Sequence, residues 1–285
     1  MEKKNNIRIK DSIDRKTILK ALSIVKKGMV FDLGMEINRR VYGQNPDVFP
    51  YSLIFESTPE DLKRQLQDIE KDSKLSGSNE VIISSIHFST HIDALCHIIY
   101  EDKVAGEFNS KDIRQKDGWK KLGAETIPPI VGRAVLLDIA KYKGVEKLEG
   151  SYKISLEDIK GYLKEKKMNI ESGDIACIRT GMSKEFYNPD YLKEGPGVSK
   201  EGAEWLAQKG IYAIGIDYAS IDALPWKDFN NCAHLQLLYK DRIYIIEALN
   251  LEELSKENIS EFLIICSAPK FTGCSGSWIR PVALV

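Results

Sequence analysis

Apolar positions along the chain follow two periodicities, and the order in which they alternate predicts an α/β fold. Short apolar runs of the length and composition typical of buried strands recur along the second half of the sequence. They cover residues 131–139, 174–178, 211–217, 242–248 and 262–266. Between several of these runs the apolar residues return at helical spacing, so we expect a mixed β-sheet with flanking helices.

Helix signals stand at four places. Ser155 followed by Asp158 resembles a capping box, and Ser199 caps a helix that Gly210 ends. A charged stretch at 59–71 is compatible with a helix. Near the start, apolar residues at helical spacing predict an amphipathic helix over 14–27 that ends near Gly28: Ile18, Leu19, Leu22 and Val25.

The first third of the chain is less regular. Residues 30–33 predict a short strand, and 34–56 contain glycines and prolines typical of an extended, irregular segment. The apolar run 81–86 predicts a buried strand. No Pro- or Gly-rich linker divides the sequence, so we expect residues 1–285 to form a single domain, with residues 1–30 as an N-terminal helical arm.

Composition narrows the partners and the compartment. The 285 residues carry a net charge of −1, with acidic and basic residues intermixed, so neither nucleic acid nor a membrane is expected as a partner. No run of about 18 apolar residues and no secretory signal is present. The five cysteines are odd in number and form no CxxC, which argues against disulfides and thiolate zinc sites. We therefore expect a soluble, cytoplasmic protein.

Histidine is scarce and clustered. Three of the four histidines, His87, His91 and His97, fall within eleven residues that also contain Asp93. Imidazole and carboxylate ligands together suit zinc, manganese or iron rather than calcium. An extended backbone places His91 and Asp93 on one side, whereas a helix aligns His87 with His91, so the cluster indicates a strand-to-helix junction. The alternative is three unrelated histidines at the surface or in the core.

Two further residues extend the candidate site. The fourth histidine is His234, and Glu247 follows in an apolar strand, where it shares a face with Ile243 and Ile245. A buried carboxylate needs a cation or a hydrogen-bonding partner, and a metal is one solution. The alternative is a glutamate at a strand end that faces water or pairs with a lysine. Asp222, at another strand end, could orient a metal-bound histidine or simply form a turn.

The histidine cluster resembles the signature of a known family. The family named "putative cyclase", which includes kynurenine formamidase-like and isatin hydrolase-like metal-dependent hydrolases, carries HxGTHxDxPxH. This chain has His87-Phe-Ser89-Thr90-His91-Ile-Asp93-Ala-Leu95-Cys-His97, with Ser89 in place of glycine and Leu95 in place of proline. The version Asp-Ala-Leu-Cys-His is similar to that of the longer members, and weaker matches follow in order from residue 30 to residue 284.

The resemblance implies a role for each candidate residue. His87, His91 and Asp93 are expected to bind metal, with Asp93 able to bridge to a second metal held by His234 and Glu247. His97 is expected to be the catalytic acid and base, although it could instead bind metal. The resemblance also implies a barrel-like, swivelling β/β/α fold and a homodimer or homotetramer. The cofactor is then one or two divalent ions per chain, Zn or Mn.

These expectations combine into a functional hypothesis. The chain is predicted to be an amidohydrolase that cleaves a non-peptide C–N bond, in an amide, formamide or lactam. A metal-activated water attacks the carbonyl carbon of a small, aromatic substrate. Phe88, Trp226 or Trp278 are candidates to line its pocket. The alternatives are a metal-dependent cyclase or dehydratase and a non-catalytic metal-binding protein.

Overall fold

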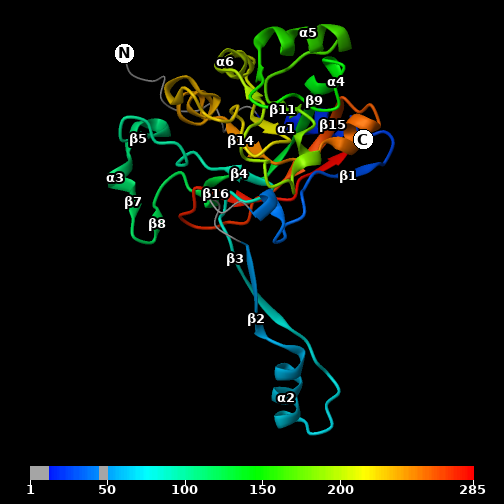
Figure 1. Cartoon of the computed structure of the whole chain (residues 1–285), viewed down its shortest axis with the longest axis vertical. Coiled ribbons are helices and arrows are strands. Elements are labelled where there is room, and N and C mark those ends of the chain that lie inside the picture. Colours follow the sequence, from blue (N-terminus) through cyan, green and yellow to red (C-terminus); the bar gives the residue numbers. More distant parts are fainter. Residues whose placement is uncertain (1–12, 45–50) are drawn as a thin grey trace.

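A mixed nine-stranded sheet forms the body of the molecule. The computed structural model describes residues 13–44 and 51–285. The strands of the sheet, in chain order, are β1 (Val30–Asp32), β4 (His91–Asp93), β9 (Ile130–Asp138), β11 (Ile175–Arg179), β13 (Ala213–Ile216), β14 (Tyr244–Glu247), β15 (Glu261–Cys266), β16 (Gly276–Trp278) and β17 (Val282–Leu284). Their spatial order is β1-β17-β15-β9-β11-β13-β14-β4-β16 (Figure 1).

The four central strands are parallel and the outer ones antiparallel. β9, β11, β13 and β14 run side by side in one direction, and β15, β17, β1, β4 and β16 add to them in antiparallel pairs. The central strands are almost entirely buried, as expected where both faces of a parallel sheet are covered. The predicted α/β class with a mixed sheet is confirmed, as are the five strands predicted from apolar runs.

Helices connect the strands of this sheet. They are α1 (Arg15–Leu22), α3 (Ser110–Ile113), α4 (Ile139–Tyr142), α5 (Leu156–Lys166), α6 (Lys200–Gln208) and α7 (Glu252–Lys256). All but α3, which lies beside β7 (Arg114–Gln115), stand close to the sheet (Figure 1). α5 packs against β9 and α6, and α4 packs against β11. Ser155 and Asp158 form the predicted capping box at the start of α5, and the Ser199 hydroxyl accepts a hydrogen bond from Gly202 N–H at the start of α6.

Short elements complete the body. The helical turns are η1 (Val41–Gln44), η2 (Ala105–Glu107), η3 (Ala124–Thr126), η4 (Met182–Glu185), η5 (Phe229–Asn231) and the π-helix η6 (Leu235–Asp241). The two-residue strands are β5 (Lys103–Val104), β6 (Phe108–Asn109), β7 (Arg114–Gln115), β8 (Gly118–Trp119), β10 (Lys153–Ile154) and β12 (Gly197–Val198). No helix in the described ranges is long and apolar enough to cross a membrane.

An arm projects from the body (Figure 1). We call residues 51–83 the arm: among the described residues β2 (Ser52–Ser57) pairs with β3 (Asn79–Ile83) and with no other strand, and α2 (Pro59–Ile69) lies at its tip. The expected helix at 59–71 is confirmed. The expectation of a buried strand at 81–86 is wrong, because every residue of β3 is exposed. The irregular segment predicted for 34–56 is also wrong over β2; Pro46 and Pro50 lie outside the described residues.

The N-terminal segment differs from the predicted helical arm over 1–30. Its first twelve residues lie outside the described part of the chain. The helix expected over 14–27 is shorter and ends at Leu22, and α1 packs against β9 and β15 of its own chain. Lys20 forms an ion pair with Glu171 in the body. From residue 13 onward this segment is therefore part of the body, and the projecting element is the arm of residues 51–83.

Candidate metal centre

Strand β4 places the first candidate residues. His91 and Asp93, two residues apart, lie on the same side of β4, as the extended spacing predicted. β4 lies between β14 and β16, so His91 is directly opposite Glu247 on one side and Trp278 on the other. The predicted helix after the strand is wrong: turns follow Asp93, and a turn also precedes β4 at His87.

Five candidate side chains meet at one point. Asp93 is central: its Oδ1 lies 2.9 Å from His87 Nδ1 and 3.4 Å from His91 Nε2, and its Oδ2 lies 3.6 Å from His234 Nε2. Glu247 reaches His91 Nε2 at 3.4 Å and His234 Nε2 at 3.2 Å. We call these five residues the His/carboxylate cluster. The structure thus brings together residues separated by up to 160 positions in the chain.

His97 lies at the edge of this cluster. Its ring stacks on His87, with ring centroids 4.1 Å apart, and lies 6.1 Å from the ring of His234. Potential ligand atoms of His87, Asp93 and His97 all lie within 4.8 Å of one another, and so do those of His91, Asp93 and Glu247. The two sets share Asp93, so the geometry has room for one or two cations, with His97 beside them.

The second nitrogen of each cluster histidine is occupied. His91 Nδ1 lies 2.9 Å from the carbonyl oxygen of Ser89, and His234 Nδ1 lies 2.6 Å from Asp222 Oδ2. His87 Nε2 lies 2.9 Å from Ser275 Oγ. Because carbonyl and carboxylate oxygens only accept, the first two contacts fix the Nδ1–H tautomer. The remaining nitrogens, His91 Nε2, His234 Nε2 and His87 Nδ1, face the cluster, and in the neutral Nδ1–H form His91 and His234 direct the Nε2 lone pair at it.

Two of these supporting residues were poorly predicted from sequence. Asp222 was weighed as an orienting residue against a simple turn former, and the structure shows that it holds His234. Its carboxylate also accepts from the backbone N–H groups of Ala233 and His234. Ser275 was not predicted to be a site residue. The only sequence signal for it was its position in a glycine-bearing loop. It acts across 188 positions of sequence.

The π-helix η6 sets the direction of His234. The histidine stands immediately before η6, whose wider turn is rare and occurs most often at functional sites. Glu247 is fixed from its own side, because its Oε1 accepts a hydrogen bond of 2.7 Å from the backbone N–H of Ile221. Gly276 leaves room for the His87 ring: a Cβ there would stand 2.8 Å from His87 Cε1. Backbone thus helps to position His87, His234 and Glu247, beside the side-chain contacts of Ser275 and Asp222.

Burial and charge oppose each other in the cluster. Burial lowers the pKa of His91, but the Asp93 and Glu247 carboxylates outweigh burial and raise the pKa to about 10. Burial also works against ionised Asp93, yet the surrounding histidines hold its pKa well below the usual range. At His97 burial prevails and lowers the pKa to about 4. Two ionised carboxylates in so dry a place require positive charge beside them.

The donor set fits a divalent cation. His91 Nε2 and both Asp93 oxygens are buried and make no hydrogen bond, although opposite groups lie within 3.6 Å. Such atoms rarely remain without a partner in a folded protein. Their lone pairs converge, and a cation at the point of convergence satisfies them. Imidazole nitrogen and carboxylate oxygen in this number are ligands typical of zinc, manganese or iron.

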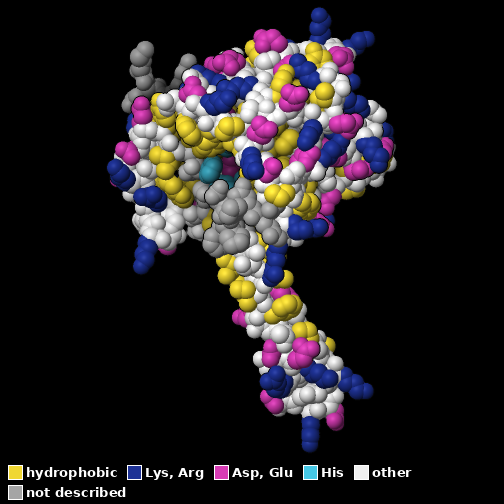
Figure 2. Space-filling model, viewed as in Figure 1, with side chains coloured by type: hydrophobic (Ala, Val, Ile, Leu, Met, Phe, Trp, Pro, Cys, Tyr) yellow, Lys and Arg dark blue, Asp and Glu magenta, His cyan; other side chains and the backbone are white. Residues whose placement is uncertain are grey.

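The cluster opens to solvent at one side. The His87 side chain is 24% exposed, whereas His91, Asp93, His234 and Glu247 are at most 6% exposed. Figure 2 shows histidine side chains inside a hollow near the base of the arm. Trp226 stands beside it, with its ring centroid 5.7 Å from that of His234. Phe88, also predicted to line the pocket, is instead buried against Tyr42, so that prediction is wrong.

Comparison with known proteins gives a consistent picture. Residues 31–223 match the model of a family described as "Putative cyclase". A kynurenine formamidase of Bacillus mycoides (strain KBAB4) is 29% identical over 212 residues, which cover 73% of this chain and 81% of that protein. A kynurenine formamidase of Bacillus anthracis is likewise 29% identical over the same length.

Solved structures share the fold. A structure described as a novel cyclase superposes with a TM-score of 0.85 at 24% identity, covering 99% of this chain and 97% of the other. Isatin hydrolase A from Ralstonia solanacearum gives a TM-score of 0.66 at 21% identity, with 94% and 97% covered. At these identities the two structures establish the architecture, while the family match spans more than half of the chain.

Proposed function

This chain belongs to the putative cyclase family, and on that premise we propose that it is a metal-dependent hydrolase of C–N bonds. The bond cleaved belongs to an amide, formamide or lactam of a small aromatic molecule. Relatives named kynurenine formamidase and a structural neighbour named isatin hydrolase support this choice of bond. The observation that carries the proposal is the buried, convergent and unsatisfied donor set of the His/carboxylate cluster.

We assign the cluster residues as metal ligands. His87, His91 and Asp93 form the principal set, and His234 and Glu247 extend it, with Asp93 shared between two positions. The cation is Zn or Mn, with one or two ions per chain. A bound cation supplies Lewis acidity toward water and toward a carbonyl group. The open side at His87 supports a catalytic site, since a structural zinc site is closed by four protein ligands.

The protein's own residues direct the chemistry. His97 accepts a proton from the attacking water at a ring nitrogen and returns it to the leaving nitrogen of the substrate. Its stacking on His87 fixes the plane of the ring and places it at the edge of the cluster. Asp222 holds His234 in position, and Trp226 offers a flat apolar surface to an aromatic substrate. Burial of the carboxylates excludes water from all but the open side.

The test is turnover together with metal content. Pure protein is incubated with N-formylkynurenine, isatin and formanilide, before and after chelation and after return of Zn or Mn. We expect hydrolysis of at least one substrate, loss of activity on chelation and recovery with metal. Elemental analysis is expected to find one or two ions per chain.

Variants separate hydrolysis from simple metal binding. Glu247→Gln is expected to lower metal content and activity, whereas Glu149→Gln, at an exposed glutamate, leaves both unchanged. His97→Ala is expected to retain metal while losing about 100-fold or more in rate. Full metal content without turnover of any substrate would favour a non-catalytic metal-binding protein. Product formation without consumption of water would favour a cyclase or dehydratase.

We also propose that the protein is a homo-oligomer in the cytoplasm. The arm exposes eight large apolar side chains, each 38–85% accessible: Leu53, Ile54, Phe55, Ile69, Leu75, Val81, Ile82 and Ile83. Exposed apolar side chains gathered on one element in this way are typical of a protein–protein interaction site. The five cysteines are all free, which supports a reducing compartment.

A further inference from the structure

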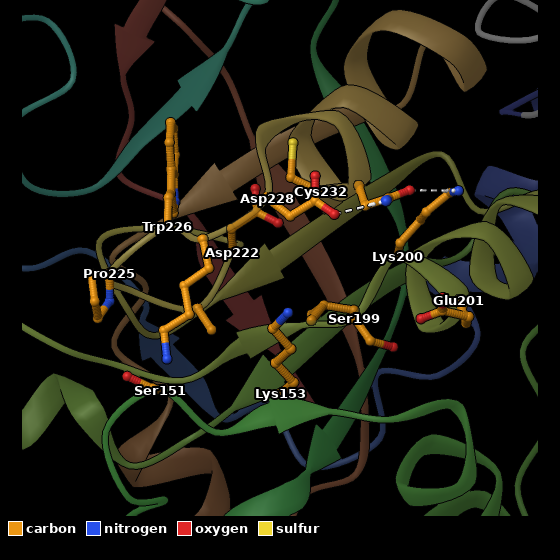
Figure 3. Close-up of a pocket in the computed structure, with 14 residues that line it drawn as sticks. Ser151, Lys153, Ser199, Lys200, Glu201, Asp222, Pro225, Trp226, Asp228 and Cys232 are labelled. Atoms are coloured by element: carbon orange, nitrogen blue, oxygen red, sulfur yellow. Dashed lines mark hydrogen bonds between the residues drawn. The ribbon is translucent and has the colours of Figure 1, made fainter.

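A second cavity lies next to the residues that support His234, outside the His/carboxylate cluster. Its volume is about 250 Å³, and none of the five cluster residues lines it. Its walls are the loop that follows β13, the start of α6 and strand β10 (Figure 3). This volume is slightly below the roughly 300–1,000 Å³ typical of sites for drug-sized ligands, so it suits a small metabolite.

Charges of both signs line this cavity without pairing. Lys153 and Lys227 bring ammonium groups to it, and Glu201 and Asp228 bring carboxylates. In the described part of the chain none of these four side chains forms an ion pair. Figure 3 shows Lys153 pointing from β10 toward the side on which Asp222 and Asp228 lie. A cavity lined by unpaired groups of opposite charge is electrostatically complementary to a ligand that carries both a positive and a negative charge.

The neighbouring groups hold the charged side chains in place around the cavity. Ser199 and Lys200, at the start of α6, add the positive end of a nine-residue helix to the side that holds Lys153. Asp228 is kept in place by hydrogen bonds from Asn230 N–H and Asn231 Nδ2. Lys200 donates to the same Asn231, so the basic and acidic sides are connected through an amide. Glu201 stands beside Lys200 on α6, and Lys227 stands beside Asp228 in the loop, so a ligand with a carboxylate and an ammonium finds partners of both signs.

An aromatic wall adds a preference for a flat group. Trp226 lines the cavity, is 42% exposed and packs edge-on against Phe229, with ring centroids 5.3 Å apart. An exposed indole is a surface on which a second aromatic ring gains about 0.5–1.5 kcal/mol beyond burial. The same indole lies beside His234, and Asp222, which also lines the cavity, holds that histidine. A ligand here contacts two supports of the metal centre without contacting the centre.

We propose that this cavity binds a small zwitterion of the α-amino acid class with a flat side chain. The carboxylate of the ligand lies toward Lys153 and Lys227, its ammonium lies toward Asp228, and its ring lies on Trp226. None of the five cluster residues lines the site, which shares only Trp226 with the surface proposed for the substrate. Its existence does not depend on the reaction proposed above, because its evidence is the lining of a different cavity.

The experiment is calorimetric titration of the full-length protein with L-phenylalanine, in the metal-loaded and the chelated state. Binding in the range of about 0.1–1 mM is expected, equal in both states within about twofold. 3-Phenylpropanoate lacks the ammonium and 2-phenylethylamine lacks the carboxylate, so each is expected to bind at least tenfold more weakly. Absence of L-phenylalanine binding up to about 10 mM would overturn the proposal, and so would equal affinity for 3-phenylpropanoate.

Three variants locate the binding. Lys153→Met and Asp228→Asn are each expected to weaken L-phenylalanine binding at least tenfold. Lys209→Met, at the far end of α6 over Trp205, is the control and is expected to bind as the unchanged protein does. Melting curves check folding, and Lys227→Met replaces any variant that melts early. Unchanged affinity in both test variants would place the ligand elsewhere and refute the site, whether or not the protein hydrolyses C–N bonds.

Discussion

Ser89 shows how a departure from the family signature is accommodated. The residue stands where the signature has glycine, and its φ of 66° lies in the left-handed region. Its backbone carbonyl must point at His91 Nδ1, which fixes this conformation. A side chain in the left-handed region costs roughly 1–2 kcal/mol, and the long Ser89 Oγ–Met35 O contact of 3.3 Å recovers only part of it. The chain therefore retains strain beside the cluster.

Ser89→Gly is accordingly expected to stabilise the fold. The relief of left-handed strain exceeds the added flexibility of the unfolded chain, so the free energy of unfolding should rise by about 0.5 kcal/mol. Urea unfolding measures the change. Ser172→Gly is the control, because Ser172 is exposed and its φ is not positive. This variant should lower the free energy of unfolding by a few tenths of a kcal/mol. A less stable Ser89→Gly would show that the hydroxyl outweighs the strain.

Asp222→Asn tests the support of His234. The carboxylate accepts from His234 Nδ1 and two backbone N–H groups, and an amide oxygen can replace only part of this set. Loss of such a supporting contact typically weakens metal binding about 10–100-fold. Competition with a coloured chelator measures the affinity for zinc. Asp190→Asn, at an exposed aspartate, should leave it unchanged; equal affinity in both variants would remove Asp222 from its supporting role.

The site was partly predictable at this scale. His87, His91 and Asp93 are close in sequence, so their spacing and a strand suffice to bring them together. His234 and Glu247 needed the scarcity of histidine, a buried strand position and the family resemblance. Ser275 and the arrangement of His97 against His87 depend on packing between distant segments, which spacing along the chain does not encode.

Among the elements, strands β11 and β13 end in a tight junction. Asp217 follows β13 and accepts hydrogen bonds from Thr180 N–H, Thr180 Oγ1 and Gly181 N–H, which follow β11. Gly181 has a φ of 82°, and a Cβ on it would stand 2.2 Å from the backbone oxygen of Glu146. The junction holds two central strands in register at the sheet edge from which the loop to Asp222 begins.

Gly181→Ala should therefore be severely destabilising. The added Cβ clashes with the backbone oxygen of Glu146, so the strands must shift. We expect the free energy of unfolding to fall by about 3 kcal/mol or more. Gly144→Ala provides a matched control, because Gly144 also has a positive φ, 72°, but no atom lies within 4 Å of the added Cβ. Gly144→Ala should lower the free energy of unfolding by only about 1 kcal/mol. Similar melting temperatures for the two variants would show that the backbone near Glu146 yields easily.

The hydrophobic periodicity predicted the positions of the strands better than it predicted whether each strand is buried. The five apolar runs after residue 130 became strands because a central parallel strand is apolar on both faces. The run at 81–86 is equally apolar, yet β3 lies in the arm. An apolar run indicates that a segment is stabilised by burial. It does not show whether the segment packs against its own chain or against another one. The shorter α1 has a local cause, since β-branched Ile24 and Val25 follow Leu22 and favour helix weakly.

For the whole molecule, the exposed apolar arm is the feature that supports the proposed homo-oligomer. Its hairpin is apolar on both faces: Leu53 pairs with Ile82 on one, and Ile54 pairs with Val81 on the other. A lone two-stranded hairpin is marginally stable in water, so both faces need cover. In the homo-oligomer proposed above, we expect symmetric exchange of arms to supply this cover, with each arm lying on the body of the other copy.

Leu53→Lys combined with Ile82→Glu tests this assembly. The two residues are cross-strand partners, so opposite charges keep the hairpin paired while making one face polar. We expect the double variant to sediment as a monomer where the unchanged protein sediments as a dimer or tetramer. Ser57→Glu with Asn79→Lys, at another cross-strand pair that is already polar, should keep the assembly. A monomeric unchanged protein, or an oligomeric test variant, would refute arm exchange.

The position of β4 between β14 and β16 has a consequence for biosynthesis. His91 and Asp93 leave the ribosome long before Glu247 and Gly276, their neighbours in the sheet. At about 5–20 residues per second, the nascent histidines wait on the order of ten seconds for those partners. A chain stalled before residue 247 lacks Glu247, one of the metal ligands proposed above. With Glu247 as a ligand, as proposed, we expect tight cation binding only in polypeptides whose translation has passed that residue.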